Sequence, residues 1–322
     1  MRIVRHAPAP SALRGAVVAL GNFDGLHRGH QAVIGEAGRI ARAEGRPWGV
    51  LTFEPHPRGF FQRSSVPFRI TPFRAKARLL DELGLDVLFV LRFDAALAAT
   101  LAQDFVVGVM LQGFSVAHVV TGPAFVFGKG RKGNGTVLGH MAAMEGFGFT
   151  QVPTQTFKGE DCSATQVRVL LRRGLVADVA AQLGRPWEFE GRVIHGAKLG
   201  RALGYPTANL ATEGRLIPHP GIYAVRAGVQ GADGVTWHEA VASLGTRPTF
   251  DGEGTLLEVY LFDFTGELYG KRLRVAFVER IRKELRFPDA LTLKRQIAED
   301  CVEARRLLAA TPRLGGLAAA HR

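Results

Sequence analysis

A short run of glycine, aspartate and histidine residues near the N-terminus has the composition of a phosphate-binding loop. The run reads Gly21-Asn22-Phe23-Asp24-Gly25-Leu26-His27-Arg28-Gly29-His30. Its glycines allow a tight turn in which the backbone can approach a ligand closely. Its two histidines would stand at the beginning of a helix, where unpaired N–H groups and the helix dipole favour an anion. A polyphosphate fits such a site.

The residues on either side of this loop predict the elements that position it. Val17–Leu20 is a short apolar run typical of a fully buried strand. After the loop, apolar residues recur at helical spacing, at Val33, Ile34, Ala37, Ile40 and Ala41. The sequence therefore predicts a strand, a glycine-bearing loop and a helix in succession.

Two plainer interpretations of His27 and His30 stay open at this point. Both could be helix-end histidines with no special task. They could also bind zinc, because residues i and i+3 lie on one helix face. However, no Glu stands between them and no Cys/His cluster supplies further ligands.

Two further loops of the first half follow predicted strands. The strand Trp48–Phe53 ends in Glu54-Pro55-His56-Pro57, where two prolines force the chain to turn. The strand Ala117–Thr121 precedes Gly122–Gly128, after which Lys129, Arg131 and Lys132 offer positive charge to phosphates. Both loops would lie at the carboxyl ends of strands, where open α/β sheets bind ligands. His56 and Phe53 could alternatively only anchor the turn.

A possible helix start lies at Ser163-Ala164-Thr165-Gln166-Val167-Arg168. Ser163 is a good N-cap residue and Gln166 would complete a capping box, which alone could explain the serine. The capping box does not explain Arg168, one turn into a helix whose N-terminus attracts phosphate. A planar guanidinium suits triphosphate oxygens, so we favour substrate binding.

Two places in the second half could carry chemistry of a different kind. Thr207 and Asn209 offer neutral oxygens that suit Mg²⁺, which keeps water and phosphate ligands beside few protein ligands. Glu258 is a carboxylate that interrupts the apolar strand Leu256–Phe262. An ordinary strand entry would explain Thr207, and an exposed strand face would explain Glu258.

The spacing of elements predicts two domains. Strands alternate with helices up to about residue 184, with helices expected at Pro72–Leu83 and within Ala95–Leu111 and a strand at Val87–Phe93; this favours a parallel, right-handed βαβ sheet. From Phe189 onward, short β-type runs separated by glycine and proline indicate an antiparallel barrel, followed by a helix over Leu291–Leu308. We expect domains at residues 1–184 and 185–310, with a loose tail at 311–322. The expected barrel strands are Gly191–Ile194, Ile222–Ala227, Glu239–Leu244, Leu256–Phe262 and Leu273–Phe277.

Composition narrows the classes of function. The chain has 322 residues, of which 47% are hydrophobic and 22% charged, as in a globular protein. Its formal net charge of +12 raises the possibility of a nucleic-acid partner. Residues 1–186 hold 22 Lys and Arg against 13 Asp and Glu, and the remainder holds 19 against 16. Because the basic residues are dispersed, we expect anionic nucleotide substrates rather than nucleic acid.

The same composition bears on the compartment. No apolar run reaches the roughly 18 residues of a membrane span, and no signal-peptide pattern follows Met1. Cys162 and Cys301 have no metal-binding spacing and suggest free thiols. We therefore expect a cytoplasmic protein without a membrane partner, and the sequence leaves its oligomeric state open.

The motifs together resemble one known family. Gly21–His30 is similar to the HxGH motif of nucleotidyltransferases, in the spelling of bacterial bifunctional riboflavin kinase/FAD synthetases. The run Gly196-Ala197-Lys198-Leu199-Gly200-Arg201-Ala202-Leu203-Gly204-Tyr205-Pro206-Thr207-Ala208-Asn209 resembles the riboflavin kinase motif, with Tyr205 for Phe. The resemblance covers nearly all of residues 15–310. It implies an α/β nucleotidyltransferase domain followed by a six-stranded antiparallel riboflavin kinase barrel with a C-terminal helix.

This resemblance assigns roles residue by residue. ATP of the adenylyltransferase would contact Gly21, Asn22, Phe23, Asp24, Gly25, His27, His30, Ser163, Thr165 and Arg168. The flavin would lie against Phe53, Pro55, His56, Pro57, Phe125 and Phe127. The kinase substrates would contact Gly196, Lys198, Gly200, Arg201, Gly204, Pro206, Thr207, Asn209, Arg282 and Phe287, with Mg²⁺ on Thr207 and Asn209. Ala124 and Asn134 depart from the family pattern, which has Asp or Asn at the first and often an acidic residue at the second.

The resemblance also implies two reactions. The barrel would transfer the ATP γ-phosphoryl group to riboflavin, with Glu258 as the base that deprotonates the alcohol. The first domain would join FMN to AMP from a second ATP, with His27 and His30 stabilising charge at the α-phosphate. Three alternatives remain: another HxGH adenylyltransferase with an accessory barrel, a tRNA-linked synthetase and a non-enzymatic nucleic-acid binder. The Gly-x-Pro-Thr-x-Asn run argues against the first, and the lack of a second Lys-rich signature loop argues against the synthetase.

Overall fold

The computed structural model describes residues 1–62, 66–196, 199–231, 234–249 and 252–312. These residues form two compact units, each described by itself. The first comprises residues 1–62 and Thr71–Ala164, and the second comprises Val66–Ile70 and the chain from Thr165 to residue 312. The domain boundary expected between residues 184 and 185 stays a prediction, and the expected tail lies outside the described residues from residue 313 onward.

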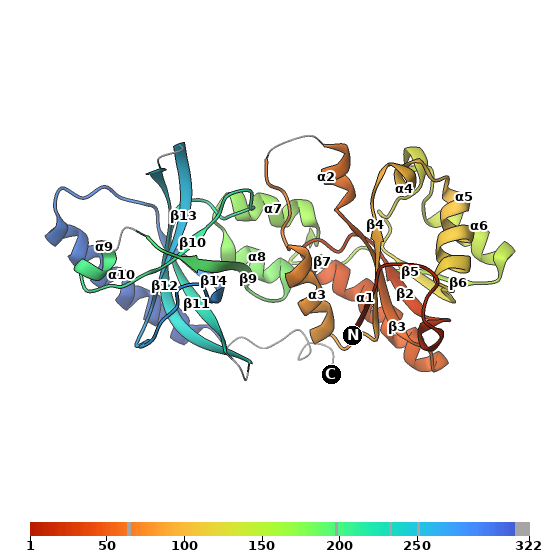
Figure 1. The fold of residues 1–322 in the computed structure, drawn as a ribbon, viewed down its shortest axis with the longest axis horizontal. Coiled ribbons are helices and arrows are strands. Elements are labelled where there is room, and N and C mark those ends of the chain that lie inside the picture. The colour runs from red at the N-terminus through yellow and green to blue at the C-terminus, as the bar shows by residue number, and fades with distance from the viewer. Residues whose placement is uncertain (63–65, 197–198, 232–233, 250–251, 313–322) are drawn as a thin grey trace. The chain divides into compact units, whose positions relative to one another are not determined.

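The first unit is built on a six-stranded parallel sheet (Figure 1). Its strands lie in the order β1-β4-β3-β2-β5-β6. From β2 the chain adds β3 and β4 on one side, and it then adds β5 and β6 on the other. The strand order therefore reverses between β2 and β5, and open α/β sheets bind ligands at such a point. The strands are β1 (Arg2–Val4), β2 (Val17–Leu20), β3 (Trp48–Glu54), β4 (Val87–Arg92), β5 (His118–Thr121) and β6 (Gly148–Gln151).

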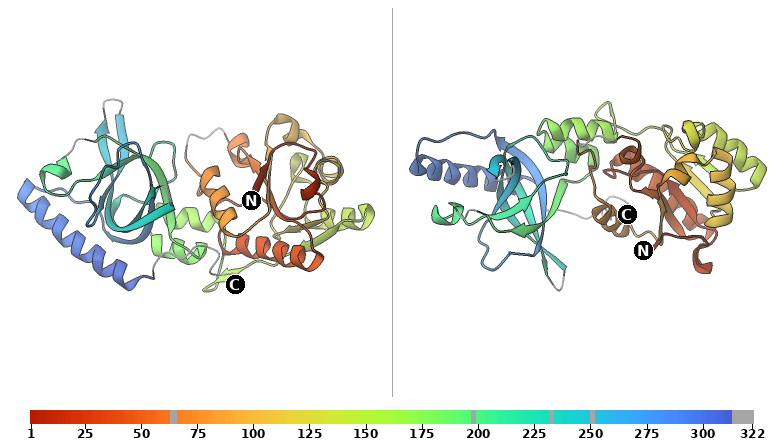
Figure 2. Two further views of the ribbon diagram at one scale, coloured as in Figure 1. Left: turned by 60° about the horizontal axis from the view of Figure 1, so that its bottom comes forward. Right: turned by 45° about the horizontal axis from the view of Figure 1, so that its top comes forward.

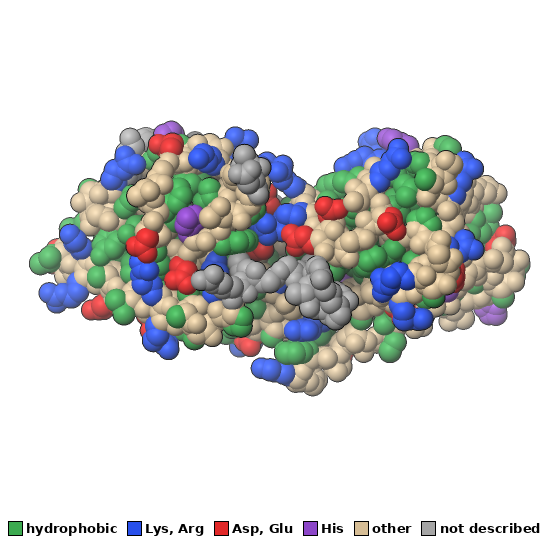
Figure 3. All heavy atoms as spheres, turned by 90° about the horizontal axis from the view of Figure 1, so that it is seen from below, with side chains coloured by type: hydrophobic (Ala, Val, Ile, Leu, Met, Phe, Trp, Pro, Cys, Tyr) green, Lys and Arg blue, Asp and Glu red, His purple; other side chains and the backbone are tan. Residues whose placement is uncertain are grey.

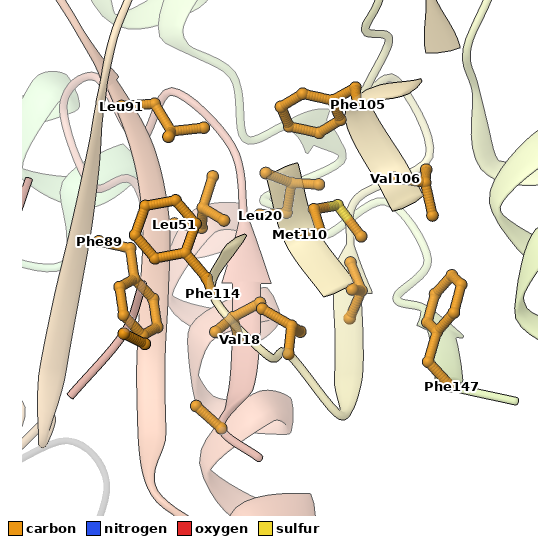
Figure 4. Close-up of a cluster of buried hydrophobic side chains, with 14 of the residues drawn as sticks. Val18, Leu20, Leu51, Phe89, Leu91, Phe105, Val106, Met110, Phe114 and Phe147 are labelled. Atoms are coloured by element: carbon orange, nitrogen blue, oxygen red, sulfur yellow. The ribbon is translucent and has the colours of Figure 1, made fainter. Parts of the chain in front are cut away.

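Helices cover both faces of this sheet because alternate strand residues point to opposite sides. Val17 and Ala19 face α1 (Arg28–Glu44) and α3 (Phe73–Glu82). Val18 and Leu20 face the other layer, which contains η2 (Phe105–Gly113) and α6 (Gly135–Glu145). Figure 4 shows the second core, in which Leu51, Phe89, Met110 and Phe114 fill the space between sheet and helices.

The remaining elements of the first unit are short. The helix expected within Ala95–Leu111 is divided at Thr100, where the backbone is extended, so that α4, α5 and η2 follow one another. A two-stranded hairpin, β7 with β8, precedes the second unit. These elements are η1 (Ser11–Leu13), α2 (Pro57–Phe61), α4 (Ala95–Ala99), α5 (Ala102–Asp104), η3 (Lys129–Arg131), β7 (Thr156–Phe157) and β8 (Glu160–Asp161).

The second unit contains a closed barrel in the order β10-β13-β12-β11-β14-β9, in which every strand pair is antiparallel. This confirms the expected fold class. The strands are β9 (Trp187–Ile194), β10 (Ala208–Ala211), β11 (Gly221–Gly231), β12 (Gly234–Thr249), β13 (Gly252–Leu261) and β14 (Arg272–Arg282).

Four helices accompany the barrel: α7 (Ala164–Arg172), α8 (Val176–Leu183), α9 (Leu199–Ala202) and α10 (Ala290–Ala310). α10 lies alongside the barrel (Figure 2) and packs on β11, β12 and β14. Its apolar residues Ala304 and Leu308 join Ile222 and Val278 in a buried cluster. The long helix expected from the sequence therefore covers part of the outside of the barrel.

The surface and the helices of the described residues add two observations. On the face drawn in Figure 3, Lys and Arg side chains are scattered among acidic and neutral ones. Within the described ranges, no helix combines the length and the apolar character needed to cross a bilayer.

Candidate active sites

The predicted strand–loop–helix unit is present at the centre of the parallel sheet. His27 is the N-cap of α1, and its Nδ1 accepts a hydrogen bond from the backbone N–H of His30 at 3.4 Å. The two imidazole rings stack with centroids 3.7 Å apart, and Phe23 packs edge-on against His30 at 5.2 Å. Both rings therefore stand at the positive end of α1, where an anionic group is favoured.

The loop that leads to these histidines is held from inside the unit. Phe23 and Asp24 are buried, and the Asp24 carboxylate accepts a hydrogen bond from the backbone N–H of Thr71 at 3.0 Å. Phe23 adopts a positive φ of 50°, which the surrounding contacts must stabilise. Gly21 and Gly25 lie at the two ends of this segment. Asp24 thus orders the loop, and its expected contact with ATP stays a prediction.

Gly29 lies in a tightly packed place at the start of α1. A Cβ at this position would lie 3.2 Å from the Cys162 carbonyl oxygen and 3.2 Å from the His27 ring. A side chain here would crowd both groups, so glycine lets the first turn of α1 lie close to them. This explains the glycine between the two histidines.

A cavity of about 810 Å³ opens beside this loop and brings the predicted flavin residues together. Phe53, His56, Pro57, Phe125 and Phe127 all line it, and so does Asn22; Pro55 does not. His56 is buried, and its Nδ1 accepts a hydrogen bond from the N–H of Arg58 at 3.1 Å, so that it caps α2.

The cavity wall is aromatic and its edge is basic. Phe53 lies 6.0 Å from Phe93 and 6.1 Å from Phe105, measured between ring centroids, and Phe105 contacts Phe127 at 5.4 Å. Large aromatic surfaces of this kind suit a planar ring system. The basic lining residues are Arg58, Lys129 and Arg131. A flat aromatic ligand that carries a phosphate would match both parts of this lining.

The two departures from the family pattern lie at different kinds of position. Ala124 is exposed and is not among the lining residues of the cavity, although its neighbour Phe125 is. Asn134 is the N-cap of α6, and its Oδ1 accepts a hydrogen bond from the N–H of Val137 at 3.0 Å. The Asn134 oxygen is thus engaged in capping a helix.

The second predicted ATP-binding segment has Ser163 in the first unit and Thr165 and Arg168 in the second. α7 begins at Ala164, directly after Ser163, and Thr165 is exposed. Arg168 is buried, and its Nε donates a hydrogen bond to the Phe68 carbonyl oxygen at 2.7 Å. This contact gives Arg168 a structural task in holding the segment Val66–Ile70. Its role toward ATP stays a prediction.

A second cavity, of about 360 Å³, lies in the barrel unit. Tyr205 and Tyr260 form an edge-on pair in its wall at 5.3 Å, and burial raises the pKa of Tyr260. Of the predicted kinase residues, those that line this cavity are Gly200, Thr207, Glu258, Arg282 and Phe287.

The strand register explains how the predicted base and the predicted metal ligands come together. β10 pairs with β13 so that Asn209 lies directly opposite Glu258. Paired residues on antiparallel strands have Cβ atoms about 4.5–5.5 Å apart. Thr207 precedes β10 by one residue and lines the same cavity as Glu258.

The donor set at this place fits Mg²⁺. Asn209 is buried, and among the residues that the structure describes its Oδ1 has no hydrogen-bond partner, which leaves this oxygen available to a ligand. The backbone of Gly196 passes close to this amide, and a Cβ there would lie only 2.5 Å from the Asn209 side-chain nitrogen. A larger residue at position 196 would therefore displace the Asn209 side chain. Mg²⁺ commonly keeps water and phosphate ligands beside few protein oxygens, so two neutral side-chain oxygens suit it.

Arg282 is held by a residue that sequence reasoning missed. Its Nε and Nη2 each lie 2.7 Å from a carboxylate oxygen of Asp300, which is buried on α10 and lines the cavity. The guanidinium also lies 5.8 Å from the centre of the Phe287 ring. Asp300 stands on the apolar stripe of its helix, seven residues after Leu293 and four before Ala304. A charged residue at such a position could have indicated from the sequence that Asp300 has a buried partner.

A smaller cavity of about 220 Å³ shares Thr207 with the one of about 360 Å³. Thr207 lines both cavities, and Arg201, Pro206 and Tyr269 line only the smaller one. His195 stacks on Tyr269 with centroids 3.9 Å apart. Gly204 ends the α9 turn with a φ of 90°, and Lys198 lies outside the described residues.

Comparisons with known proteins find relatives of both halves of the chain. A family model described as FAD synthetase matches residues 9–166, and one described as riboflavin kinase matches residues 183–308. The bifunctional riboflavin kinase/FMN adenylyltransferase of Escherichia coli K12 is 38% identical over 315 residues, which is 97% of this chain and 99% of that protein. Proteins of the same name from Pseudomonas fluorescens and Bacillus subtilis are 40% and 37% identical, covering 92% and 90% of this chain and 94% and 91% of their own length.

One solved structure is similar along most of the chain. The crystal structure of a macrolide-efflux protein from Streptococcus pneumoniae has a TM-score of 0.83 and 29% sequence identity. The match covers 94% of this chain and 98% of that one.

Proposed function

The chain belongs to the family of bifunctional riboflavin kinase/FMN adenylyltransferases, and from this membership we propose how its residues divide two reactions. The protein phosphorylates riboflavin with ATP to give FMN. It then joins FMN to the adenylyl group of a second ATP, giving FAD and pyrophosphate. Which side chains perform each step is the subject of the proposal.

For the kinase step, riboflavin occupies the cavity of about 360 Å³ and the ATP phosphates approach from the smaller cavity across Thr207. Glu258 takes the proton of the attacking hydroxyl, because a neutral alcohol is a poor nucleophile. Tyr205 and Tyr260 offer the flavin an aromatic wall, and Arg282 is kept in place by Asp300. The observation that carries this assignment is the pairing of Asn209 with Glu258 beside the cavity.

Thr207 and Asn209 would hold Mg²⁺ through their side-chain oxygens. When bound, the ion neutralises phosphate charge during phosphoryl transfer. Asn209 contributes an oxygen that has no partner in the described part of the chain, and Thr207 contributes a hydroxyl that lines both cavities.

For the adenylyltransferase step, FMN occupies the aromatic cavity of about 810 Å³, with its phosphate toward the basic edge. The attacking phosphate oxygen is already anionic, so this step needs no base. His27, His30 and the N–H groups at the start of α1 stabilise the negative charge that develops at the α-phosphate. The contacts of Ser163, Thr165 and Arg168 with ATP belong to the same proposal.

Incubation of the full chain with riboflavin, ATP and Mg²⁺, followed by chromatographic separation of the flavins, tests the assignment. FMN should accumulate first and FAD should follow. FAD formation from supplied FMN, without any phosphorylation of riboflavin, would instead favour an HxGH adenylyltransferase with an accessory barrel. RNA binding that weakens with salt, without ATP turnover, would favour a nucleic-acid binder.

We further propose a cytoplasmic location, as expected for an enzyme that uses ATP and small flavins. The likeness to the S. pneumoniae structure carries only the fold, because one fold can serve unrelated functions. We therefore do not transfer macrolide efflux to this chain.

A further inference from the structure

Lys76 is a fully buried cation that neither reaction described above uses. It lies on α3, and its side chain is 0% exposed. Its Nζ is 3.0 Å from the Asn22 carbonyl oxygen, 3.1 Å from Glu54 Oε1 and 3.4 Å from Thr52 Oγ1. A lysine ammonium has three N–H donors, and three oxygens lie within their reach.

These oxygens come from two neighbouring strand ends. Asn22 follows β2 in the loop that leads to the stacked histidines, whereas Thr52 and Glu54 are at the end of β3. β2 and β3 pair in parallel, with Leu20 opposite Leu51. Thr52 Oγ1 also donates to the Asn22 carbonyl oxygen at 3.3 Å, so the two strand ends are joined through one small polar cluster.

The same strand ends carry the two halves of the proposed adenylyltransferase site. Asn22 begins the ATP-binding loop and lines the aromatic cavity. Glu54 stands between Phe53 and His56, which line the cavity proposed for FMN. The ammonium therefore connects the loop proposed for one substrate to the loop proposed for the other.

We propose that Lys76 is a positioning residue for FMN adenylyltransfer, which fixes the ATP-binding loop relative to the flavin-binding loop. The inference rests on the function proposed above. Bringing two substrates together requires accurate placement, and a misplacement of about 1 Å can cost about 10²-fold in rate. Each loop would keep its own substrate contacts without the ammonium, but their relative position would be less well defined.

Stability alone does not require a charge at this position. Lys76 lies on the apolar face of α3 with Leu79 and Leu80, where a hydrophobic side chain would pack without the cost of burying an ammonium. Replacement of a buried ion pair by apolar or neutral groups is often neutral or stabilising. A charged pair retained here is thus better explained by the geometry that it imposes on the two loops.

The test compares Lys76→Met with the double variant Lys76→Met/Glu54→Gln, using the full chain. The single variant leaves the Glu54 carboxylate without its buried cation, whereas the double variant also removes that charge. Lys76→Arg keeps the charge in a planar, larger group. Arg74→Met, an exposed position on the same helix, is the matched control. For each protein, kcat and KM are measured for FMN and ATP, and riboflavin phosphorylation by the barrel is measured in the same preparation.

The positioning role predicts that kcat for FAD synthesis falls about 10- to 100-fold in Lys76→Met, while KM for FMN and for ATP changes less than about threefold. The loss should persist in the double variant even where its unfolding midpoint equals that of the parent, and Lys76→Arg should recover part of it. Arg74→Met and the kinase activity should stay within about twofold of the parent. A double variant with restored stability and full FAD synthesis would overturn the proposal.

Two further outcomes are also decisive. If Lys76→Met does not fold, Thr52→Val is measured instead, because it removes the hydroxyl that contacts both Lys76 and the Asn22 carbonyl oxygen. It should still lower kcat with little change in KM, and unchanged kinetics would refute the inference. If the parent protein makes no FAD from FMN and ATP, the proposed function fails. If the parent makes FAD and the double variant does so equally well, only the positioning role fails.

Discussion

Glu258 lines its cavity together with other polar side chains, but only Glu258 is proposed to take a proton from the attacking hydroxyl. Deprotonation of a hydroxyl is needed only when riboflavin is the acceptor, because the FMN phosphate is already anionic. The two reactions of the chain should therefore respond differently to the loss of this one carboxylate.

Glu258→Gln keeps the shape of the side chain and removes the base. FMN formation from riboflavin should fall about 10²-fold or more, and FAD formation from supplied FMN should stay near the parent value. Flavin separation after incubation with either substrate measures both rates. Glu239→Gln, on the neighbouring strand β12 and outside the cavity, is the control. Equal loss of both activities in a folded Glu258→Gln protein would contradict the assignment.

At the residue scale, sequence reasoning found the groups with recognisable motifs and missed those whose partners are distant in sequence. Lys76 and Asp300 each stand on the apolar face of an amphipathic helix, where a charge demands a buried partner. The spacing could have identified both residues as unusual. It could not have named Glu54 or Arg282 as their partners, because those contacts depend on how the strands are placed in the fold.

At the scale of elements, hydrophobic patterning predicted the longer strands and helices more readily than the short ones. α3 and α10 lie within two residues of their expected bounds, since their apolar stripes extend over several turns. β1, β6 and β10 were not expected, whereas the equally short β2 was, because Val17–Leu20 is an unbroken apolar run and the other three strands each contain polar residues. The rhythm of short β-type runs indicated an antiparallel barrel, and the number of six strands came from the family resemblance.

α10 is held at its C-terminal end by a buried arginine of the barrel. Arg226 on β11 donates to the carbonyl oxygens of Leu308, Thr311 and Pro312 at 2.9, 2.8 and 2.6 Å. Helix ends leave such carbonyls without intrahelical partners. This contact anchors the helix that also presents Asp300 to Arg282 in the cavity proposed for riboflavin.

Replacing Arg226 by Met should lower the stability of the barrel unit by roughly 2–4 kcal/mol, since several charge-assisted hydrogen bonds are lost. Arg226→Lys should lose less, because it keeps the charge but not the fork of donors. Urea denaturation followed by far-UV circular dichroism and by residual riboflavin kinase activity measures the effect. An unchanged midpoint in Arg226→Met would show that the apolar face of α10 suffices to hold it.

Cys301, on the same helix, should make the stability of the barrel unit depend on pH. Burial, assisted by the nearby Asp300 carboxylate, raises the pKa of the thiol from 9.0 to about 11. Below pH 9 the thiol is neutral in the folded and unfolded chains. Between about pH 9 and 11 only the unfolded chain ionises, so the stability of the barrel unit should fall as the pH rises through this range.

Cys301→Ala should therefore flatten the decline in stability between about pH 9 and 11. Burial also raises the pKa of Tyr223 to about 12, so a further decline above pH 10 should remain in the variant. Urea midpoints measured at several pH values, with a reductant present, compare the variant with the parent. Parallel curves for the two proteins would contradict a contribution from this thiol.

At the scale of the whole molecule, the second compact unit begins near Thr165, before Gly184–Trp187, where the sequence pattern changes from alternating strands and helices to short β-type runs. α8 packs on β9 and β14, and its Val176, Val179 and Leu183 are buried. The Leu171 carbonyl oxygen of α7 accepts a hydrogen bond from the N–H of His219 at 3.1 Å. These contacts associate both helices with the barrel, although the alternation of strands and helices grouped them with the first domain.

Two fragments test which limit describes the kinase. Residues 165–322 retain α8 and most of α7, whereas residues 185–322 begin directly before β9; both retain the barrel and every proposed kinase residue. The longer fragment should fold cooperatively and phosphorylate riboflavin with a kcat/KM within about fivefold of the full chain. The shorter one should be several kcal/mol less stable, since each buried apolar side chain of α8 contributes about 1.5–3 kcal/mol. Neither should make FAD. Equal urea midpoints for the two fragments would support a domain boundary at residue 185. A longer fragment that is folded but inactive would mean that the kinase site needs residues of the first unit.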